Sequence, residues 1–586
     1  MNGKRLVKNI KKDQTNHMRK IYAILAILAC SAGITAQTQD SLLRRQLELE
    51  RDFNPTLLDA DKINSLPALR EPVVQKANTN YSSWAGRITP PLEIALPRPG
   101  QIMTAIPYHT QKGYLSFKAG NYANMDGAFG YRLIEKEKQT LAFTFTHQSV
   151  NGEVDYLQEG LPESSDLFFM DNRGELAFQH SGDANEITLN LSYLHSRFNY
   201  YGNPMGSAGY FNDDKQRLGL LHASLGLISS ESDLLNYHGK LDLKNFSTGL
   251  AYPSSSDPLK GNEIHLMAGF DKPFRNNATK AGVDGTLVTA LYGGDWDNYL
   301  LLNAAPYLRY EGLNRSARLG VDILFQTGDQ TRVRVVPNVA LQLGITERTS
   351  LYANIHGGFD HNTYLDMMGE SRYFIANENV KASFSIVDID GGIRIGDAEG
   401  FRFDLFGGFK KTDDEHFMVL HGTVEEDGLW AGPFYEGLKP LYGDLTHARL
   451  GGLVQVGMWA PLDLSLRLTQ NFYTVKNLSD YGESVNDPKA YNKPGLEVEL
   501  KGSLEVSDKL SFNMDYYFAG DRWSYYMGEN REMEQINDLS LGAAYRISEA
   551  FSFGMRAGNL MNQQYDLWYG HPSQGFNVMG GFTFRF

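Results

Sequence analysis

Apolar and polar residues alternate one by one along much of the chain after Gly113. In the segment 462–469, leucine stands at every second position, and the positions between carry polar residues such as Asp463 and Arg467. A period of two places successive side chains on opposite faces of a β-strand. The clearest further examples are residues 496–506, 510–518, 539–547 and 576–586.

These strands suit a transmembrane β-barrel, whose strands of about 9–11 residues turn apolar side chains to lipid and polar ones to a wet lumen. A large soluble β-sandwich or β-propeller is the alternative. Full charges on the polar faces, such as Glu497, Glu499 and Lys501, argue against it, because the opposite faces are apolar without interruption.

The connections between strands also favour a barrel, because they come in two lengths. Short polar turns are expected at 135–138, 346–349, 397–400, 507–508 and 548–549. Long connections are expected at 150–171, 196–214, 358–385, 425–443, 476–492, 520–535 and 559–575. Short periplasmic turns and long external loops are typical of outer-membrane barrels.

The number of strand candidates between 113 and 586 is about 22, within a range of about 20 to 24, and such barrels have an even number of strands. The predicted fold class is therefore all-β, a transmembrane antiparallel barrel of about 22 strands. Because an unpaired edge cannot face lipid, the last strand should pair with the first, near 113–122. Past residue 36 no apolar run reaches the ~18 residues that a membrane helix needs.

The first 36 residues have the pattern of an export signal. Arg19 and Lys20 precede the apolar run 21–29, and the small residues around Ala36 suit cleavage before Gln37. We expect a signal peptide at 1–36, with translation starting at Met18. Lipidation of Cys30, the only cysteine, is the alternative.

Cleavage after Ala36 removes seven basic residues and one acidic residue, which changes the net charge from -14 to -20. So acidic a chain is a poor nucleic-acid binder, because that binding depends on basic patches. A mature chain without cysteine also excludes disulfides and thiolate metal sites.

Residues 37–112 differ from the rest in their proline content, with eight of the 21 prolines. Proline lacks the backbone donor that a sheet needs. We therefore expect an irregular arm at 37–112, in the periplasm or against the lumen, and the barrel at 113–586. Basic arm residues such as Arg44 and Arg45 complement lumen acids such as Glu497; the lumen charges could equally line a solute path.

The last thirty residues resemble the closing segment of TonB-dependent receptors. The matching features are the run Asn559–Asn562, Tyr565, the Trp-Tyr-Gly-His-Pro motif at 568–572, Gly575 and a terminal aromatic strand. The resemblance implies that the strand end is recognised by the barrel-assembly machinery. The assembly signal would then consist of Phe582, Phe584 and Phe586.

The N-terminal part departs from that family, whose members carry a globular plug of well over a hundred residues. Residues 47–72 instead resemble the arm of TonB-receptor-like barrels without a full plug in the Bacteroidota. The implied partners are outer-membrane lipid, the barrel-assembly machinery, and TonB or other envelope proteins. Energised uptake stays open.

No catalytic, cofactor or metal site is predicted, and the chain is not expected to be an enzyme. Asp388, Asp390 and Gly391 resemble part of a calcium loop, but no glutamate follows at the required offset, so a strand is expected. Residues 413–416, with sequence DDEH, could offer metal ligands but are expected to form a charged loop between strands.

Aromatic residues near strand ends are the candidate ligand contacts. They would either form the girdle at the membrane interface or stack against a ligand. The candidates are Tyr200, Tyr201, Trp523, Tyr525, Tyr526 and Trp568.

Together these features predict a barrel in the bacterial outer membrane that passes or captures an unidentified ligand. The alternative is a non-transporting scaffold subunit of an outer-membrane complex.

Overall fold

The computed structural model describes most of the chain after residue 110. The described residues are 111–157, 163–201, 216–249, 258–274, 278–294, 296–327, 331–375, 379–397, 400–422, 435–459, 461–480, 482–526 and 528–586. The predicted signal peptide and nearly all of the predicted arm lie outside these residues. Among the described residues, no helix is long and apolar enough to cross a membrane.

Twenty-two strands form one antiparallel sheet. In chain order they are β1 Gly113–Gly120, β2 Met125–Lys136, β3 Gln139–Asp155, β4 Ser164–Ser181, β5 Asn185–Phe198, β6 Gln216–Ser229, β7 Asn236–Thr248, β8 Lys260–Pro273, β9 Thr279–Tyr292, β10 Tyr299–Glu311, β11 Arg315–Thr327, β12 Arg332–Thr346, β13 Thr349–Asp360, β14 Ser383–Gly396, β15 Phe401–Gly422, β16 Tyr435–Trp459, β17 Leu462–Lys476, β20 Leu496–Ser507, β21 Leu510–Gly520, β24 Ile536–Arg546, β25 Phe551–Gly558 and β28 Asn577–Arg585.

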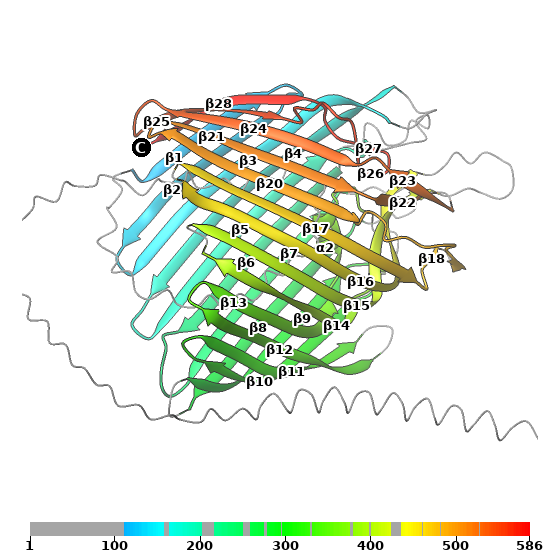
Figure 1. The fold of residues 1–586 in the computed structure, drawn as a ribbon. Helices are drawn as coiled ribbons and strands as arrows, with labels where there is room; N and C mark the ends of the chain where they lie inside the picture. Colours follow the sequence, from blue (N-terminus) through cyan, green and yellow to red (C-terminus); the bar gives the residue numbers. More distant parts are fainter. Residues whose placement is uncertain are drawn as a thin grey trace, which may run out of the picture. The chain divides into compact units, whose positions relative to one another are not determined.

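The sheet closes on itself, so the fold is a barrel (Figure 1). Each strand pairs with the next in the barrel, and β28 pairs with β1 from Tyr114 opposite Arg585 to Gly120 opposite Met579. Closure satisfies the backbone donors and acceptors that an open edge would expose to lipid. The prediction of a 22-stranded transmembrane barrel of the outer-membrane type is confirmed.

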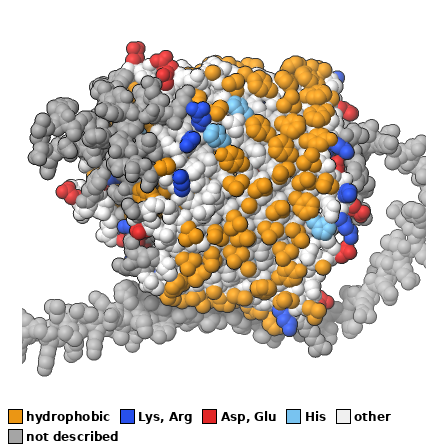
Figure 2. Space-filling view, turned by 180° about the vertical axis from the view of Figure 1, so that it is seen from behind, with side chains coloured by type: hydrophobic (Ala, Val, Ile, Leu, Met, Phe, Trp, Pro, Cys, Tyr) orange, Lys and Arg blue, Asp and Glu red, His pale blue; other side chains and the backbone are white. Residues whose placement is uncertain are grey.

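The outer face of the barrel is apolar and the inner face is polar. Exposed large side chains follow every second position of neighbouring strands, as with Leu189 on β5, which lies opposite Leu225 on β6. Figure 2 shows a broad surface of such apolar side chains on one side of the barrel. A soluble protein does not expose an apolar surface of this extent, so the outer face is suited to lipid.

The connections alternate in length around the barrel. At one end the turns are short, as between β2 and β3, β12 and β13, and β20 and β21. At the other end the connections are longer and carry their own elements. These are α2 Tyr364–Glu370 and the small hairpins β18 Ser479–Asp480 with β19 Glu483–Ser484, β22 Arg522–Tyr526 with β23 Glu529–Met533, and β26 Asp566–Trp568 with β27 His571–Pro572.

Several strands are longer than the sequence pattern predicts. β15 has 22 residues and β16 has 25, beyond the roughly 11 needed to cross a membrane. The expectation of a strand-connecting loop at 413–416 is therefore wrong. A register shift between Thr412 and Glu415, with Asp414 at φ 54°, interrupts the alternation there while pairing with β16 continues.

The closing seam is aromatic. Phe586 stacks on Phe584, Phe129 and Tyr131 with centroid distances of 5.8, 6.4 and 6.2 Å. Its backbone exchanges hydrogen bonds of 2.8 and 3.0 Å with Gly113. Phe582, the third predicted assembly residue, stacks on Phe551 at 5.8 Å. These ring contacts connect the first strands of the barrel in the sequence with the last ones, β2 with β28 and β25.

Candidate functional site

The barrel encloses a cavity of about 1830 Å³. Its wall is formed by strands from β11 round to β28, and α2 contributes Leu365, Asp366 and Glu370. The wall is densely charged, with carboxylates, guanidinium groups and lysine ammonium groups side by side. Such a surface suits a polar or charged solute better than an apolar one.

One charge cluster on the wall centres on Asp404 of β15. Arg402 donates from Nε to Asp404 Oδ1 at 2.9 Å, and Arg394 of β14 places Nε 3.5 Å from Oδ2. Asp404 is buried. Both guanidinium groups therefore approach the same carboxylate, and this part of the wall pairs one acid with two bases.

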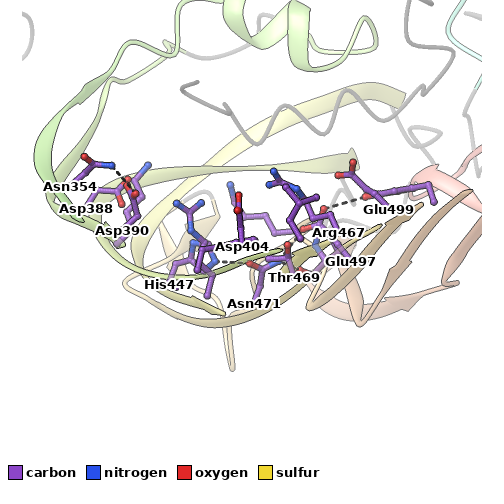
Figure 3. Close-up of a pocket in the computed structure, with 18 of the residues that line it drawn as sticks. Asn354, Asp388, Asp390, Asp404, His447, Arg467, Thr469, Asn471, Glu497 and Glu499 are labelled. Atoms are coloured by element: carbon purple, nitrogen blue, oxygen red, sulfur yellow. Dashed lines mark hydrogen bonds between the residues drawn. The ribbon is translucent and has the colours of Figure 1, made fainter. Parts of the chain in front are cut away.

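A second cluster crosses β16, β17 and β20, as Figure 3 shows. The His447 ring and Asn471 Oδ1 lie 3.0 Å apart, and Asn471 Nδ2 donates to Glu497 Oε1 at 3.0 Å. Arg467 lies directly opposite Glu499 across the strands. Arg467, Glu497 and Glu499, which the sequence places on polar strand faces, therefore lie together on the cavity wall.

The two aspartates that resemble a calcium loop lie on strand β14. Asp390 accepts a 3.0 Å hydrogen bond from Asn354, and Asp388 lies 3.5 Å from His356. Among the described residues, no group of three or more acidic, histidine or cysteine side chains is placed to hold a metal ion.

The long connection between β13 and β14 folds across the barrel mouth; residues 361–375 are called here the in-folded loop. Its helix α2 begins with a capping box, in which the Thr363 side chain accepts from the Asp366 amide and Asp366 accepts from the Thr363 amide. On β8, the fully buried Glu263 accepts a 3.4 Å hydrogen bond from the Leu365 amide. The start of the loop is thus held at the wall.

The other end of the in-folded loop contacts distant strands. Arg372 forms a 3.0 Å ion pair with Asp171 of β4, and its guanidinium lies 4.3 Å from the centroid of Phe169. Glu370 and His416 of β15 approach to 2.6 Å. The loop therefore bridges widely separated parts of the barrel above the cavity.

Aromatic side chains from two other connections pack on this loop. Together the three segments, residues 199–201, 361–375 and 565–573, form what we call the loop layer. His571 lies 4.7 Å from Tyr373 and 5.6 Å from Tyr201 between ring centroids. Burial lowers the pKa of His571 to about 4 and raises the pKa of Tyr373 to about 12. Both side chains are therefore neutral at pH 7.

The predicted contact aromatics are mostly buried inside packed loops. Tyr201 is fully buried, and Tyr200, Tyr525, Tyr526 and Trp568 are each less than a tenth exposed. Trp523 is partly buried and donates to Asp521 Oδ1 at 3.2 Å. Of these residues only Trp568 lines the cavity. Direct contact with a ligand stays a prediction.

The residues that hold the in-folded loop were not found from the sequence. Thr363 and Asp366 carry a recognisable helix-start signal, a threonine followed three residues later by an acid. No local signal joins Arg372 to Asp171, because the two lie 201 positions apart.

Comparison with solved structures finds similar barrels among TonB-dependent receptors. The ferric enterobactin receptor PfeA of Pseudomonas aeruginosa is 12% identical, with a TM-score of 0.59 over 81% of this chain and 80% of that one. The ferric-catecholate import receptor Fiu of E. coli K12 is 12% identical, with a TM-score of 0.56 over 81% and 82%. The copper transporter OprC is 13% identical, with a TM-score of 0.57 over 81% and 80%.

At these identities the similarity establishes the fold alone. It confirms that the barrel has the fold of TonB-dependent receptors, as the sequence resemblance implies. No protein-family model matches the chain. No curated protein matches it either.

Proposed function

We propose that this protein is a receptor-like barrel of the bacterial outer membrane that captures a polar or charged ligand and passes it through its lumen. The observation that carries the proposal is the charged cavity beneath the in-folded loop. A solute entering from the loop end would meet the loop layer first and the charged wall next. Chemistry on the solute is not part of the proposal.

The proposed route needs the in-folded loop to move. Its contacts with the wall include packed rings, such as Tyr364 on Tyr292 of β9 at 4.7 Å between centroids, and polar pairs, which exchange with water more easily. Arg372 with Asp171 is the pair that fastens the loop to the far wall. Opening there would join the cavity to the outside.

The test is a charge reversal at this pair in cells that make the full chain and lack their major porins. Arg372→Glu places two negative groups together, so we expect increased uptake of a large hydrophilic antibiotic. The swap Asp171→Arg with Arg372→Asp should restore the barrier.

Arg318→Glu is the matched control. Like Arg372, Arg318 forms an ion pair, 2.7 Å to Asp284, and lies over an aromatic ring, 3.8 Å from the centroid of Tyr307. It does not contact the in-folded loop, so uptake should stay at the unmodified level. Equal uptake by Arg372→Glu and the unmodified protein would contradict passage through the lumen.

A scaffold role is the second candidate, and the loop layer favours it. An apolar core built from several connections gives the loop end a fixed surface, as a binding platform requires. In that case Arg372→Glu would release co-purified envelope proteins without changing uptake.

We further propose that Phe582, Phe584 and Phe586 form the signal read by the barrel-assembly machinery. Phe586→Ala removes a ring that stacks on rings of β28 and β2, so surface levels should fall several-fold. Phe553→Ala is the control, since Phe553 is a comparably exposed outward ring of the neighbouring strand. Normal surface levels of Phe586→Ala would contradict the proposal.

A further inference from the structure

The outer rim of β5–β8 carries basic residues that have no acidic partner among the described residues. Arg197 of β5 lies directly opposite Arg217 of β6. Both are exposed and lie on the lipid-facing side, since they share the face of Tyr193 and Leu221, which are 52% and 43% exposed. Like charges directly opposite each other destabilise a sheet, so this pair calls for an anion between them.

A polar row runs across the same face, one position nearer to the apolar surface. Asn172, His195, Gly219, Ser247 and Lys260 follow one another from β4 to β8, because each lies opposite the next in the strand register. On β3, His147 bonds Asn172 at 2.8 Å and extends the row. The missing side chain at Gly219 lets the Tyr193 hydroxyl approach the row, since a Cβ at this position would lie only 3.2 Å from that hydroxyl.

The geometry allows these cations to act on one headgroup. Lys260 lies two strands from Arg217 and two residues along the strand direction, which is about 12 Å at the usual strand spacing and rise. Long basic side chains cover that gap from both sides while their stems lie on apolar surface. Figure 2 shows blue and pale-blue side chains gathered beside the apolar surface of this side of the barrel.

Acidic side chains are displaced from this rim. The nearest acid of β4 on this face is Asp166, opposite Glu153 of β3, four residues beyond Met170. At the strand rise that is about 13 Å. Met170 lies opposite Arg197, so the described part of the rim is positive, and only the polar row separates the two arginines from the apolar surface.

We infer that Arg197, Arg217 and Lys260 bind the phosphate groups of a phosphorylated outer-leaflet lipid whose acyl chains lie on the apolar face below. The positive rim matches the headgroup and the adjoining apolar surface matches the chains, which a free anion would not need. The inference rests on the proposed membrane location and not on passage of a ligand.

The rim of β16 and β17 provides a contrast. There the outward-facing Asp444 lies directly opposite Lys476, so the lysine has an acid as its cross-strand neighbour. A charge with its own partner gains less from a lipid phosphate. This difference supplies the control for the experiment.

The experiment uses the purified full chain in phosphatidylcholine nanodiscs doped with lipid A. Lipid A retained by the protein is counted by native mass spectrometry. Arg197→Gln with Arg217→Gln should weaken retention about tenfold or more, as expected for removing two cations near an anionic surface. Lys411 of β15 is exposed and lies opposite Thr446 of β16, beside the same rim. Lys411→Gln with Lys476→Gln therefore removes two other outer cations, and this variant should retain lipid A as the unmodified protein does.

Further arms separate the sources of the phosphate. Dephosphorylated lipid A should be retained poorly by every variant, and 10 mM inorganic phosphate should not displace lipid A. Equal retention of the dephosphorylated lipid, displacement by inorganic phosphate, or equal loss in both double variants would each overturn the inference. Heat-modifiable gel mobility shows whether each variant forms a closed barrel, so failure of the barrel and failure of the lipid site are distinguishable.

Discussion

The inner wall of β14–β20 and the outer rim of β5–β8 use the same antiparallel register for opposite arrangements of charge. On the inner wall Arg394 lies opposite Asp404, and Arg467 lies opposite Glu499. On the outer rim Arg197 lies opposite Arg217. In a sheet, directly opposite residues are the pairs that interact most strongly.

This difference separates charges that the barrel satisfies itself from charges that need an external partner. The inner pairs stabilise one arrangement of the wall, so a ligand has to compete with them. The outer pair has no acidic neighbour among the described residues and gains from any anion that reaches it. A charged residue is therefore a better indicator of a bound counter-ion when the residue opposite it on the next strand has the same charge.

The largest expected effect comes from breaking a cluster on the inner wall. Asp404→Asn leaves Arg394 and Arg402 without their shared negative charge. Removing one partner of a buried ion pair typically costs about 3 kcal/mol or more, and we expect that loss in the free energy of unfolding in detergent micelles.

Asp390→Asn is the matched control on the neighbouring wall, because Asp390 accepts from the neutral amide of Asn354. Its cost should be within about 1 kcal/mol, the usual contribution of one hydrogen bond. Equal losses of stability in the two variants would show that the Asp404 cluster stabilises the barrel no more than one neutral hydrogen bond does.

His571 in the loop layer is an intermediate case. It is fully buried, and its Nε2 has no hydrogen-bond partner among the described residues. Its pKa of about 4 lies below the ordinary value of 6.5, so the unfolded loop binds a proton that the packed loop does not. Stability is therefore complete above pH 6.5 and is lost as the pH falls toward 4.

At pH 5 this loss amounts to about 2 kcal/mol for opening of the loop layer. We expect limited proteolysis of the external loops to be at least tenfold faster at pH 5 than at pH 7.5, after correction for protease activity. His571→Phe keeps a ring against Tyr373 and does not titrate, so it should remove the pH dependence. Persistence of the full dependence in that variant would assign it to another group.

The barrel was predictable because its signal is local and repeated. Alternation along 462–469 and 510–518 defines a face at each strand, and the cost of an open edge in lipid then requires β28 to meet β1. A charged run such as 413–416 resembles a loop in the sequence, and the register shift between Thr412 and Glu415 that keeps it within a strand has no local signal.

The site was less predictable because it depends on contacts between distant connections. Tyr201, Tyr373 and His571 come from three different loops, and their burial follows from packing among those loops. The sequence indicates aromatic side chains near strand ends but not whether those side chains meet one another, lipid or a ligand.

The smallest expected effect is a gain in stability from a substitution on the outer rim. It tests the contrast between inner wall and outer rim most sharply, because substitutions on the inner wall should lower stability. Arg217→Glu converts the like-charged outer pair into an opposite-charged one, which should raise the free energy of unfolding by roughly 0.5–1 kcal/mol in a lipid-A-free zwitterionic detergent. Lys476→Glu is the mirror control, since it faces Asp444 and should lower stability by a similar amount. With lipid A present, the gain from Arg217→Glu should disappear, because the unmodified rim then has its anion and the variant does not. Stabilisation that is unchanged by lipid A would mean that the two arginines merely repel each other.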